Sequence, residues 1–419
     1  MFKFIHAADL HIDSPLRGLE AYEGAPADQL RGATREAFAN IVKLARDEAV
    51  DFLVVAGDLF DGKWPDMRTG LWTASQFRLL ERENISVYLV RGNHDAESRV
   101  RQSVSWPDNV HEFSVRKAQT LRVESLGVAL HGQGFAKQEC QDDLAANYPE
   151  AVKDCFNIGV LHTSLTGSSE HDTYAPTRED VLVGRGYDYW ALGHVHQRSV
   201  PPIRTDPYIA FCGNAQGRHI RETGEKGCLL VTVEDGEIAN VDFRATDVAR
   251  WHLAEVALES SDTIADVQAK ANDCLTACHE SSDGRFCAVR LVLRGACAAH
   301  RSLISKTERQ EFLGELRNQA NSLHDEVWLE KVAVDTSLPI DWELLRQGSD
   351  LLGDLLRDSE VIDADAEQLS QFSSDLSPLV DKAGLELADA GIKIDDTEQL
   401  RRWLHQAKTL LVGQLREGE

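Results

Sequence analysis

The stretch Val54–Asp61 (VVAGDLFD) gives the first indication of the fold. The apolar, valine-rich run from Phe52 to Ala56 predicts a short buried strand, which Gly57 ends. Asp58 then stands at the carboxyl end of this strand, the edge at which open α/β sheets bind ligands. Taken alone, the Gly57-Asp58 pair is equally compatible with the cap of a following helix. The rest of the sequence decides between these two interpretations.

Residues that can bind metal ions follow five predicted strands in the same way. The apolar runs are 3–8, 52–56, 85–90, 156–161 and 187–192, and the residues that follow them are Asp9 with His11, Asp58, Asn93 with His94 and Asp95, His162, and His194 with His196. A lone histidine is more often structural, and Asp9-x-His11 alone is compatible with an Asx turn. Helical spacing over 28–48 and 69–83 separates the first three strands, so the chain begins β-α-β-α-β. The repetition therefore indicates one site at one edge of a sheet.

The residue types indicate the chemistry of this site. Imidazole and carboxylate ligands together favour manganese, iron or zinc over magnesium, which prefers oxygen ligands. We expect two divalent ions, most simply Mn²⁺, with Asp58 as the bridging ligand. Two such ions can activate a water molecule and clamp a phosphate. The pattern thus predicts phosphoester hydrolysis without a serine or cysteine nucleophile, and the sequence has no P-loop.

Composition narrows the class of protein. The 419 residues include no apolar run that approaches a membrane span, and the N-terminus lacks a signal-peptide pattern, so a cytoplasmic protein without a membrane contact is expected. The eight cysteines form no Cys-x-x-Cys pair, which argues against a structural zinc site or a disulfide framework. The formal net charge of -25 argues against binding nucleic acid by a basic face alone. An anionic ligand would need bound cations or a basic partner.

The remaining pattern predicts three domains. Short strands between residues 110 and 243 complete a first domain over 1–248. A β-α-β-α-β succession predicts a small α+β domain over 249–338. After Pro339, residues 339–419 are acidic, leucine-rich and helical, and we expect them to form a helical tail that can dock on a partner. Within this tail, 359–377 is poorer in apolar residues and is predicted as a linker.

The motifs resemble those of the calcineurin-like metallophosphoesterase superfamily. Within it, Phe4–His11 (FIHAADLH), Gly57–Asp61 (GDLFD) and Arg91–Asp95 (RGNHD) resemble the SbcD-type DNA repair nucleases, and the YhaO-like branch most closely. Further similar words are DSPLRGL at 13–19, LHTS at 161–164, YDYWALGHVH at 187–196 and GNAQGR at 213–218. The resemblance is strong over 1–250, weaker over 251–335 and weakest in the tail. It implies a four-layer α/β/β/α sandwich, a small α+β capping domain and a helical C-terminal tail.

The resemblance also implies roles for individual residues. One ion would be held by Asp9, His11, Asp58 and His196, and the other by Asp58, Asn93, His162 and His194. His94 would face the scissile phosphate as a general acid, and Asp95 would orient His94 or a metal ligand. Asp61 is a departure, because some relatives carry there a histidine that is tied to the handling of DNA ends. The balance between exonuclease and endonuclease activity is therefore left open.

The resemblance implies a metal-dependent DNA nuclease that acts in DNA repair. It would be an exonuclease, with endonuclease activity as an additional expectation. The basic residues expected to contact DNA near the site are Arg17, Arg91, Arg218, His219 and Arg221. The family further implies a coiled-coil ATPase partner related to SbcC, and it raises the expectation of a homodimer.

Two alternatives stay open at this point. The metal motifs belong to the whole superfamily, so a small phosphodiester, a cyclic nucleotide or a phosphoprotein is a second substrate class. The additional domain at 251–335 argues against a minimal phosphatase. A third hypothesis is a non-enzymatic scaffold with a decayed site, and the presence of every expected ligand argues against it.

Overall fold

The computed structural model describes residues 1–14, 26–62, 67–97, 104–165, 174–323, 326–365 and 396–417, together with positions 369, 371, 374 and 378. The chain divides into two compact units. The first comprises Met1–Ala254, Asn272–Leu291 and Leu316–Val332, and the second comprises Glu255–Ala271, Val292–Glu315 and Ala333–Glu419. The predicted division into domains 1–248, 249–338 and 339–419 stays a prediction.

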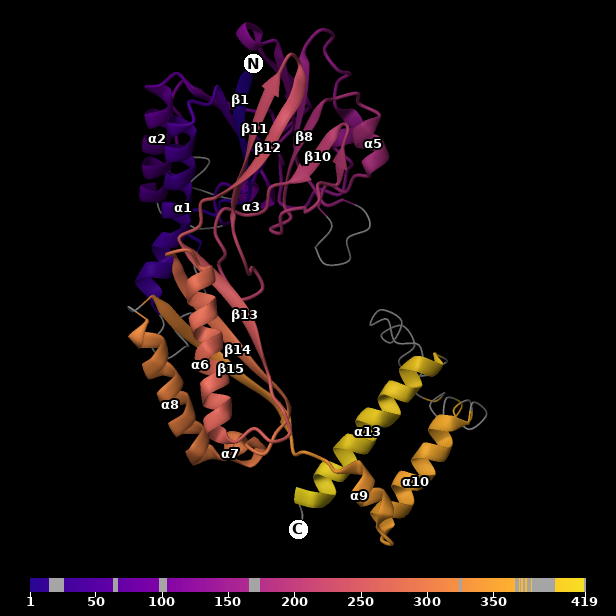
Figure 1. Ribbon diagram of the computed structural model, residues 1–419. Helices are drawn as coiled ribbons and strands as arrows, with labels where there is room; N and C mark the ends of the chain where they lie inside the picture. Colours follow the sequence, from indigo (N-terminus) through magenta and orange to yellow (C-terminus); the bar gives the residue numbers. More distant parts are fainter. Residues whose placement is uncertain are drawn as a thin grey trace. The chain divides into compact units, whose positions relative to one another are not determined.

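Two six-stranded mixed sheets form the centre of the first unit (Figure 1). In the first sheet, β1 to β4 run parallel, while β11 and β12 extend it by antiparallel pairing next to β1. In the second sheet, β6, β7, β8 and β10 run parallel, with β5 and β9 antiparallel at its edges. The first sheet has the order β12 (Glu237–Ala245), β11 (Gly227–Glu234), β1 (Phe2–Ala7), β2 (Phe52–Val55), β3 (Ser86–Leu89) and β4 (Val110–Glu112). The second has the order β5 (Gln119–Val123), β6 (Val128–Gly132), β7 (Phe156–His162), β8 (Tyr189–Gly193), β10 (Tyr208–Phe211) and β9 (Arg204–Thr205).

Alternating side chains on the strands build a four-layer structure. One face of the first sheet, including Phe4, packs against Ile158 and Tyr189 of the second sheet in a shared core. The next residue on β1, Ile5, lies on the opposite face and packs in the core under α1 (Ala27–Asp47) and α2 (Met67–Glu81). On the far side of the second sheet, Trp190 packs in a third core with Leu182 of α5 (Glu179–Val183). The expected α/β/β/α sandwich is therefore confirmed (Figure 1).

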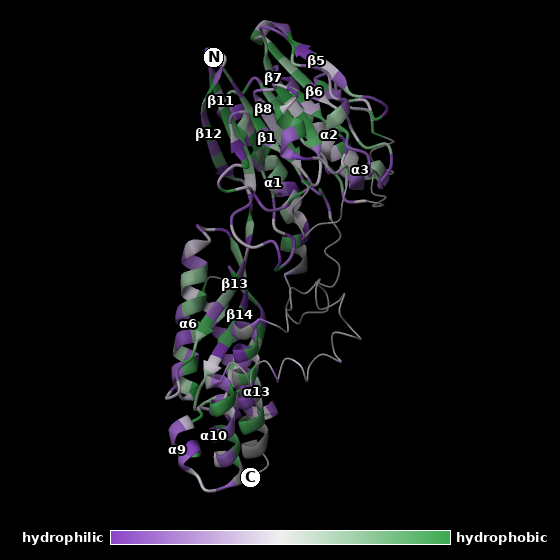
Figure 2. Cartoon of the chain, turned by 90° about the vertical axis from the view of Figure 1, so that its right-hand side faces the viewer, coloured by the Kyte–Doolittle hydropathy of each residue, from purple (hydrophilic) through white to green (hydrophobic). Residues whose placement is uncertain are grey.

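Burial on both faces explains why the strands read as nearly continuous apolar runs. Figure 2 shows the central strands mostly in the colour of apolar residues. Short elements that the sequence did not predict connect them: α3 (Asn93–Glu97), η2 (Glu124–Leu126) and η3 (Ala145–Asn147).

Helix α1 joins two parts of the first unit. Its residues Ala37 and Ile41 are fully buried in the core on the first sheet. Near its N-terminal end, Leu30 and Ala33 pack in a separate cluster with Trp251. The spacing that predicted a helix over 28–48 therefore serves two cores rather than one.

A third sheet follows the sandwich in the chain. It has the order β13 (Ala249–Ala257), β14 (Phe286–Ala296) and β15 (Val327–Ser337). Helices α6 (Ile264–Ser281) and α8 (Lys306–Ser322) separate these strands, as the sequence predicted, and the short helix α7 (His300–Ile304) is an addition.

The second unit includes the C-terminal helices α9 (Trp342–Gln347), α10 (Leu351–Ala364) and α13 (Thr397–Glu417). The Asp341 and Asp350 side chains cap α9 and α10 by accepting hydrogen bonds from backbone N–H groups of the first turns. The predicted linker over 359–377 is wrong in its first part, because α10 continues to Ala364 and Ser359 is buried within it. Most positions after 365 in this segment lie outside the described residues. Among the described helices, none is long and apolar enough to span a lipid bilayer.

We predict that Phe4→Ala lowers the free energy of unfolding by about 3–5 kcal/mol. The Phe4 ring is fully buried, stacks on Phe52 at a centroid distance of 5.1 Å and meets Tyr189 edge-on at 5.2 Å. Denaturant unfolding measures the change, with Leu71→Ala as the control, since Leu71 is 60% exposed. A loss below about 1 kcal/mol in Phe4→Ala would contradict a shared core between the sheets.

Candidate metal centre

The ends of five strands meet at one edge of the sandwich. Asp9 and His11 follow β1, Asp58 follows β2, and Asn93 follows β3 on the first sheet. On the second sheet, His162 ends β7, and His194 and His196 follow β8 (Tyr189–Gly193). Hydrogen bonds cross between the sheets here, because His162 Nδ1 lies 2.9 Å from the Ala56 carbonyl oxygen. The structure therefore brings together the residues that the sequence predicted as one site.

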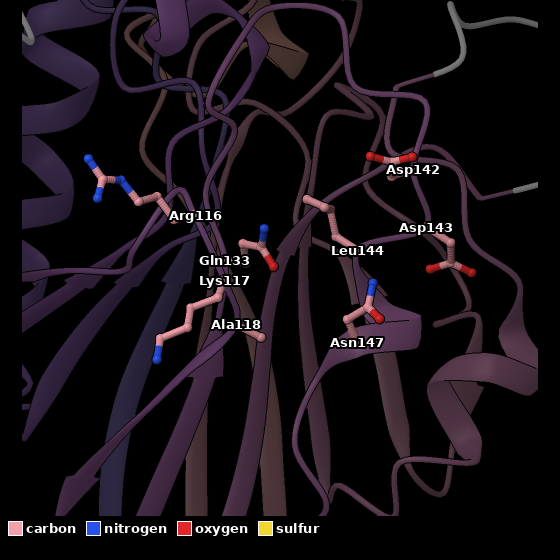
Figure 3. Close-up of a pocket in the computed structure, with 8 residues that line it drawn as sticks. All are labelled: Arg116, Lys117, Ala118, Gln133, Asp142, Asp143, Leu144 and Asn147. Carbon is pink, nitrogen blue, oxygen red and sulfur yellow. The ribbon is translucent and has the colours of Figure 1, made fainter.

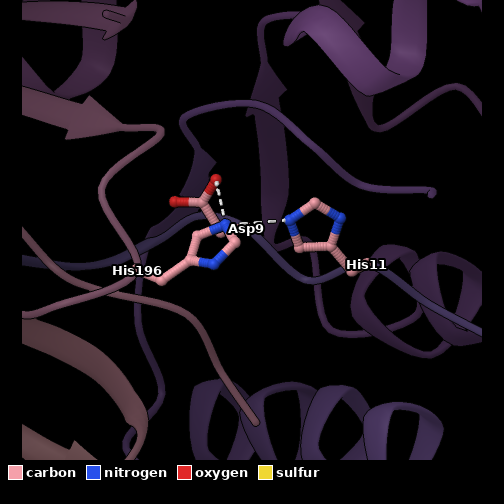
Figure 4. Close-up of side chains that lie close together, drawn as sticks. All are labelled: Asp9, His11 and His196. Carbon is pink, nitrogen blue, oxygen red and sulfur yellow. Dashed lines mark hydrogen bonds and ion pairs between the residues drawn. The ribbon is translucent and has the colours of Figure 1, made fainter. Parts of the chain in front are cut away.

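Three of these side chains gather around a first position (Figure 4). The Nε2 atoms of His11 and His196 are 3.1 Å apart, and His196 Nε2 lies 3.8 Å from Asp9 Oδ1. Ligand atoms about 2.1 Å from one ion lie roughly 3.0–3.4 Å from each other in octahedral or tetrahedral geometry. The 3.1 Å spacing lies within this range and the 3.8 Å spacing is longer, so Asp9 would have to move closer for the three side chains to share a cation. Asp9 and His11 are buried.

A second position lies on the other side of Asp58. Asp58 Oδ2 is 3.4 Å from His162 Nε2, which in turn is 2.9 Å from Asn93 Oδ1. The same Asp58 oxygen lies 3.8 Å from His11 Nε2. Asp58 thus reaches both groups, which is the position that a bridging ligand needs.

His194 enters the site differently. Its backbone N–H donates to both oxygens of Asp9, at 3.2 and 3.0 Å. Its ring centroid lies 5.2 Å from that of His162. The closely spaced clusters of ionisable ligands found among the described residues do not include the His194 side chain.

The backbone is bent sharply where the ligands enter. Asp9, His11, Asp58 and His194 have φ values of 50°, 42°, 52° and 102°, in the left-handed region that residues other than glycine rarely adopt. Backbone hydrogen bonds from Asp9 N–H to the Gly57 carbonyl and from His11 N–H to the Asp58 carbonyl, both 3.0 Å, hold these bends. Such strain concentrates at functional sites, where the fold must turn side chains toward a ligand.

The charges of the site call for a cation. Burial raises the pKa of Asp9, although His196 and His162 oppose this shift. Burial acts on Asp58 in the same way, but His162 and His94 outweigh it and hold the pKa of Asp58 below its usual range. Buried carboxylates are stable only when they are paired with positive charge. The buried donors therefore fit divalent ions.

Residues around the ligands fix their orientation. The Glu222 Oε1 atom lies 2.7 Å from His196 Nδ1, which leaves His196 Nε2 directed at the site. Glu222 is not among the residues that the sequence predicted for the site. Its spacing of four residues from Arg218 is a signal for an ion pair, whereas only the basic residues Arg218, His219 and Arg221 of this segment were assigned a role.

His94 lies at the rim, with 36% of its side chain exposed. Its Nδ1 is 2.9 Å from Asp61 Oδ1, while Ser14 Oγ donates to Asp61 Oδ2 at 2.6 Å. Burial lowers the pKa of His94, but the bond to Asp61 and the charge of Asp58 outweigh burial and raise it above its ordinary value. Asp61 thus orients His94.

Asp95 has another role in the structure. Its carboxylate accepts backbone N–H bonds from Leu59 at 3.1 Å, Phe60 at 3.0 Å and Gly92 at 3.1 Å. It therefore ties the loop that carries Asp58 to the loop that carries Asn93. Of the two roles expected for Asp95, the structure places it in support of the ligand loops.

The predicted DNA contacts lie in different environments. Arg17 is outside the described residues, and Arg91 pairs with Glu112 at 2.5 Å. The Arg218 side chain is only 14% exposed, because it turns inward toward Glu222. His219, with 53% of its side chain exposed, and Arg221 face solvent.

A polar cavity of about 680 Å³ lies elsewhere in the first unit (Figure 3). Its walls carry cationic side chains, amides and carboxylates, but none of the predicted site residues. The lining residues are Arg116, Lys117, Ala118, Gln133, Asp142, Asp143, Leu144 and Asn147.

Comparisons with known proteins agree with the geometry of the metal centre. The family model for calcineurin-like phosphoesterases matches residues 2–198, and the model for the middle domain of metallophosphoesterase YhaO matches residues 251–337. The chain is 35% identical over 328 residues to YhaO of Bacillus subtilis (strain 168), described as an uncharacterized metallophosphoesterase, and this match covers 78% of the chain and 79% of that relative. The chain belongs to the YhaO family of calcineurin-like metallophosphoesterases.

Membership in the YhaO family confirms the superfamily and the branch that the motifs indicated, and with them a hydrolase that uses divalent metal ions. Among solved structures, the comparison includes the crystal structure of TT1561 of Thermus thermophilus, with 14% identity and a TM-score of 0.32. That match covers 58% of this chain and 98% of the other.

We predict that Gly92→Ala weakens Mn²⁺ binding by about 10-fold or more. An added Cβ at Gly92 would lie 2.2 Å from Asp58 Oδ1 and 2.7 Å from the Asp58 backbone nitrogen, so it must displace the Asp58 carboxylate. Isothermal titration with Mn²⁺ measures the effect. Gly32→Ala in α1 is the matched control, since its nearest neighbour would be 3.7 Å away. Equal affinities in the two variants would contradict the placement of Asp58 in the centre.

Proposed function

We propose that this YhaO-family metallophosphoesterase is a Mn²⁺-dependent DNA nuclease of the SbcD type that acts as an exonuclease in DNA repair. The observation that carries the proposal is the Asp61–His94 pair, which stands at the rim of a buried aspartate and histidine centre. The likeness of the strand-end motifs to SbcD-type nucleases supports DNA as the substrate. Endonuclease activity is a further part of the proposal.

The proposed ligands combine the side chains that lie close together in the structure with His194, which is assigned from the family resemblance. Asp9, His11 and His196 would hold one ion, Asn93, His162 and His194 the other, with Asp58 shared. When bound, two divalent ions supply an activated water and neutralise the charge of a phosphate. The mixture of imidazole and carboxylate supports Mn²⁺, while iron and zinc suit the same donors.

His94 would protonate the leaving oxygen. Because Asp61 Oδ1 accepts from His94 Nδ1, the second ring nitrogen is directed away from Asp61 and can carry the proton that is transferred. Water adds to phosphorus and gives up one proton to solvent, the bond to the leaving oxygen breaks, and the His94 Nε2 proton passes to that oxygen. His94 then regains a proton from solvent. Exposure of 36% leaves the His94 ring accessible to a substrate.

Binding of DNA by so acidic a protein needs local attraction. We propose His219 and Arg221 as phosphate contacts. Both residues are exposed and lie in the segment that follows β10. Bound ions and a basic partner would supply the remainder, so affinity should fall steeply with salt.

We further propose an SbcC-like coiled-coil ATPase as a partner that docks on the C-terminal helices. Leu344 on α9 and Val361 on α10 are 65% and 54% exposed, and such apolar positions on helices support helix-to-helix docking. A homodimer is an additional proposal from the family resemblance. Removal of the chain from Pro339 onward should abolish binding of the ATPase, and unchanged binding would contradict this part.

The second candidate, hydrolysis of a small phosphodiester or a phosphoprotein, shares the same centre. The decisive test incubates labelled linear double-stranded, linear single-stranded and closed-circular DNA with Mn²⁺, with Mg²⁺ and with chelator. We predict Mn²⁺-dependent shortening from the ends that His94→Ala lacks, and cutting of circles would show endonuclease activity. Hydrolysis of a chromogenic phosphodiester with no action on any DNA would favour the second candidate.

We predict that Asp61→Asn lowers kcat on a phosphodiester by about 100-fold, because a neutral amide no longer favours the protonated His94. The Mn²⁺ affinity should change little, since Asp61 is not among the proposed ligands. Steady-state kinetics and titration calorimetry together check this, with Asp180→Asn as the surface control. A kcat within about 3-fold of the wild type would contradict the role of Asp61.

A further inference from the structure

The loop after β10 places polar side chains inside the protein beside His196. Asn214, Gln216 and Glu222 are 0%, 2% and 5% exposed, and the Arg218 side chain is 14% exposed. Gln216 fixes the base of the loop, because its Oε1 accepts from Val248 N–H at 2.9 Å and its Nε2 donates to the Ala249 carbonyl at 2.6 Å. The loop is therefore held as a rigid element rather than as a solvated basic patch.

Glu222 is immobilised on several sides. Its Oε2 accepts from the Arg218 backbone N–H at 2.7 Å and from Asn214 Nδ2 at 3.1 Å, while its Oε1 lies 2.7 Å from His196 Nδ1. An ionised carboxylate only accepts hydrogen bonds, so His196 Nδ1 carries the proton and Nε2 keeps its lone pair for the metal centre. Glu222 thus fixes both the tautomer and the orientation of His196.

Arg218 joins this arrangement to the rim of the site. Its Nη2 donates to Glu222 Oε1 at 3.0 Å, and its Nη1 lies 3.9 Å from Asp61 Oδ2. Asp61 in turn holds His94. One guanidinium therefore stands between two carboxylates, and each carboxylate orients an imidazole.

A cation beside a centre that binds cations is unfavourable by charge alone, so its position requires a compensating role. We propose that Arg218 is a positioning residue that orients His196 through Glu222 and His94 through Asp61. This assigns to Arg218 a structural part in the centre, in place of the DNA phosphate contact expected from the sequence. The proposal has two arms. The His94 arm, in which Arg218 orients His94 through Asp61, rests on the proposed function. The His196 arm, in which Arg218 orients His196 through Glu222, concerns metal binding alone.

Titration with Mn²⁺ separates positioning from charge. If Arg218 positions Glu222, Arg218→Met weakens Mn²⁺ binding by about 10-fold, as does Glu222→Gln, and the double variant is no weaker than either single one. If Arg218 acts only by its charge, Arg218→Met removes a repelling cation and tightens binding. Tighter or unchanged binding in Arg218→Met overturns the proposal.

Turnover at saturating Mn²⁺ tests the second arm. With bis(4-nitrophenyl) phosphate as the probe and the metal sites filled, the two variants are compared with each other. The kcat of Arg218→Met should be about 10-fold or more below that of Glu222→Gln, because in Arg218→Met Asp61 has lost its cationic neighbour as well. Full recovery of Arg218→Met would remove the His94 arm.

Matched controls exclude a general effect of losing an ion pair. Arg204 and Glu179 form an exposed pair at 3.2 Å in the same unit, so Arg204→Met and Glu179→Gln should leave Mn²⁺ affinity unchanged. Arg218→Lys keeps the charge without the planar fork, and we expect an intermediate affinity. If Arg218→Met does not fold, Arg218→Lys replaces it in the Mn²⁺ titration. If the wild type binds Mn²⁺ but cleaves no phosphodiester, the proposed function is contradicted. The Mn²⁺ affinities of Arg218→Met and Glu222→Gln would still test the His196 arm.

Discussion

The burial of two aspartates, Asp9 and Asp58, where two sheets meet is the constraint on which the structure depends. Each carboxylate is 1% exposed, and each follows a strand whose next residues turn through a left-handed conformation. Such burial is costly unless positive charge is present. The surrounding imidazoles supply part of it, and divalent ions would supply the rest.

The sandwich gives this site its rigidity. Two sheets packed face to face share a core of aromatic and branched side chains, so the strand ends cannot shift independently. His162, from the second sheet, bonds to the Ala56 carbonyl of the first, and His194 N–H bonds to Asp9. The metal centre is thus a product of the packing between sheets, and chemistry can be added at its rim by residues such as His94.

The strand ends could be predicted from the sequence because three features coincide there. An apolar run marks each strand, glycine often lies at its end, and a residue that can bind a metal ion follows. Asp9, Asp58 and His162 each follow an apolar run, and parallel strands carry such residues to the same edge. The partners of these residues were harder to predict. Asp61 and Asp95 both lie within the quoted motifs, and only the fold shows that Asp61 pairs with His94 while Asp95 accepts hydrogen bonds from backbone N–H groups. The role expected for Arg218 rested on its charge, whereas the structure shows its side chain largely buried between Glu222 and Asp61.

Anomalous diffraction at the manganese edge, from crystals of the protein grown with Mn²⁺, tests the metal centre most directly. We predict two manganese peaks per chain at the edge where the sheets meet, with Asp58 coordinating both and His196 coordinating one through Nε2. A single peak, or a pair of peaks that do not share Asp58, would contradict a two-metal centre built on the buried aspartates.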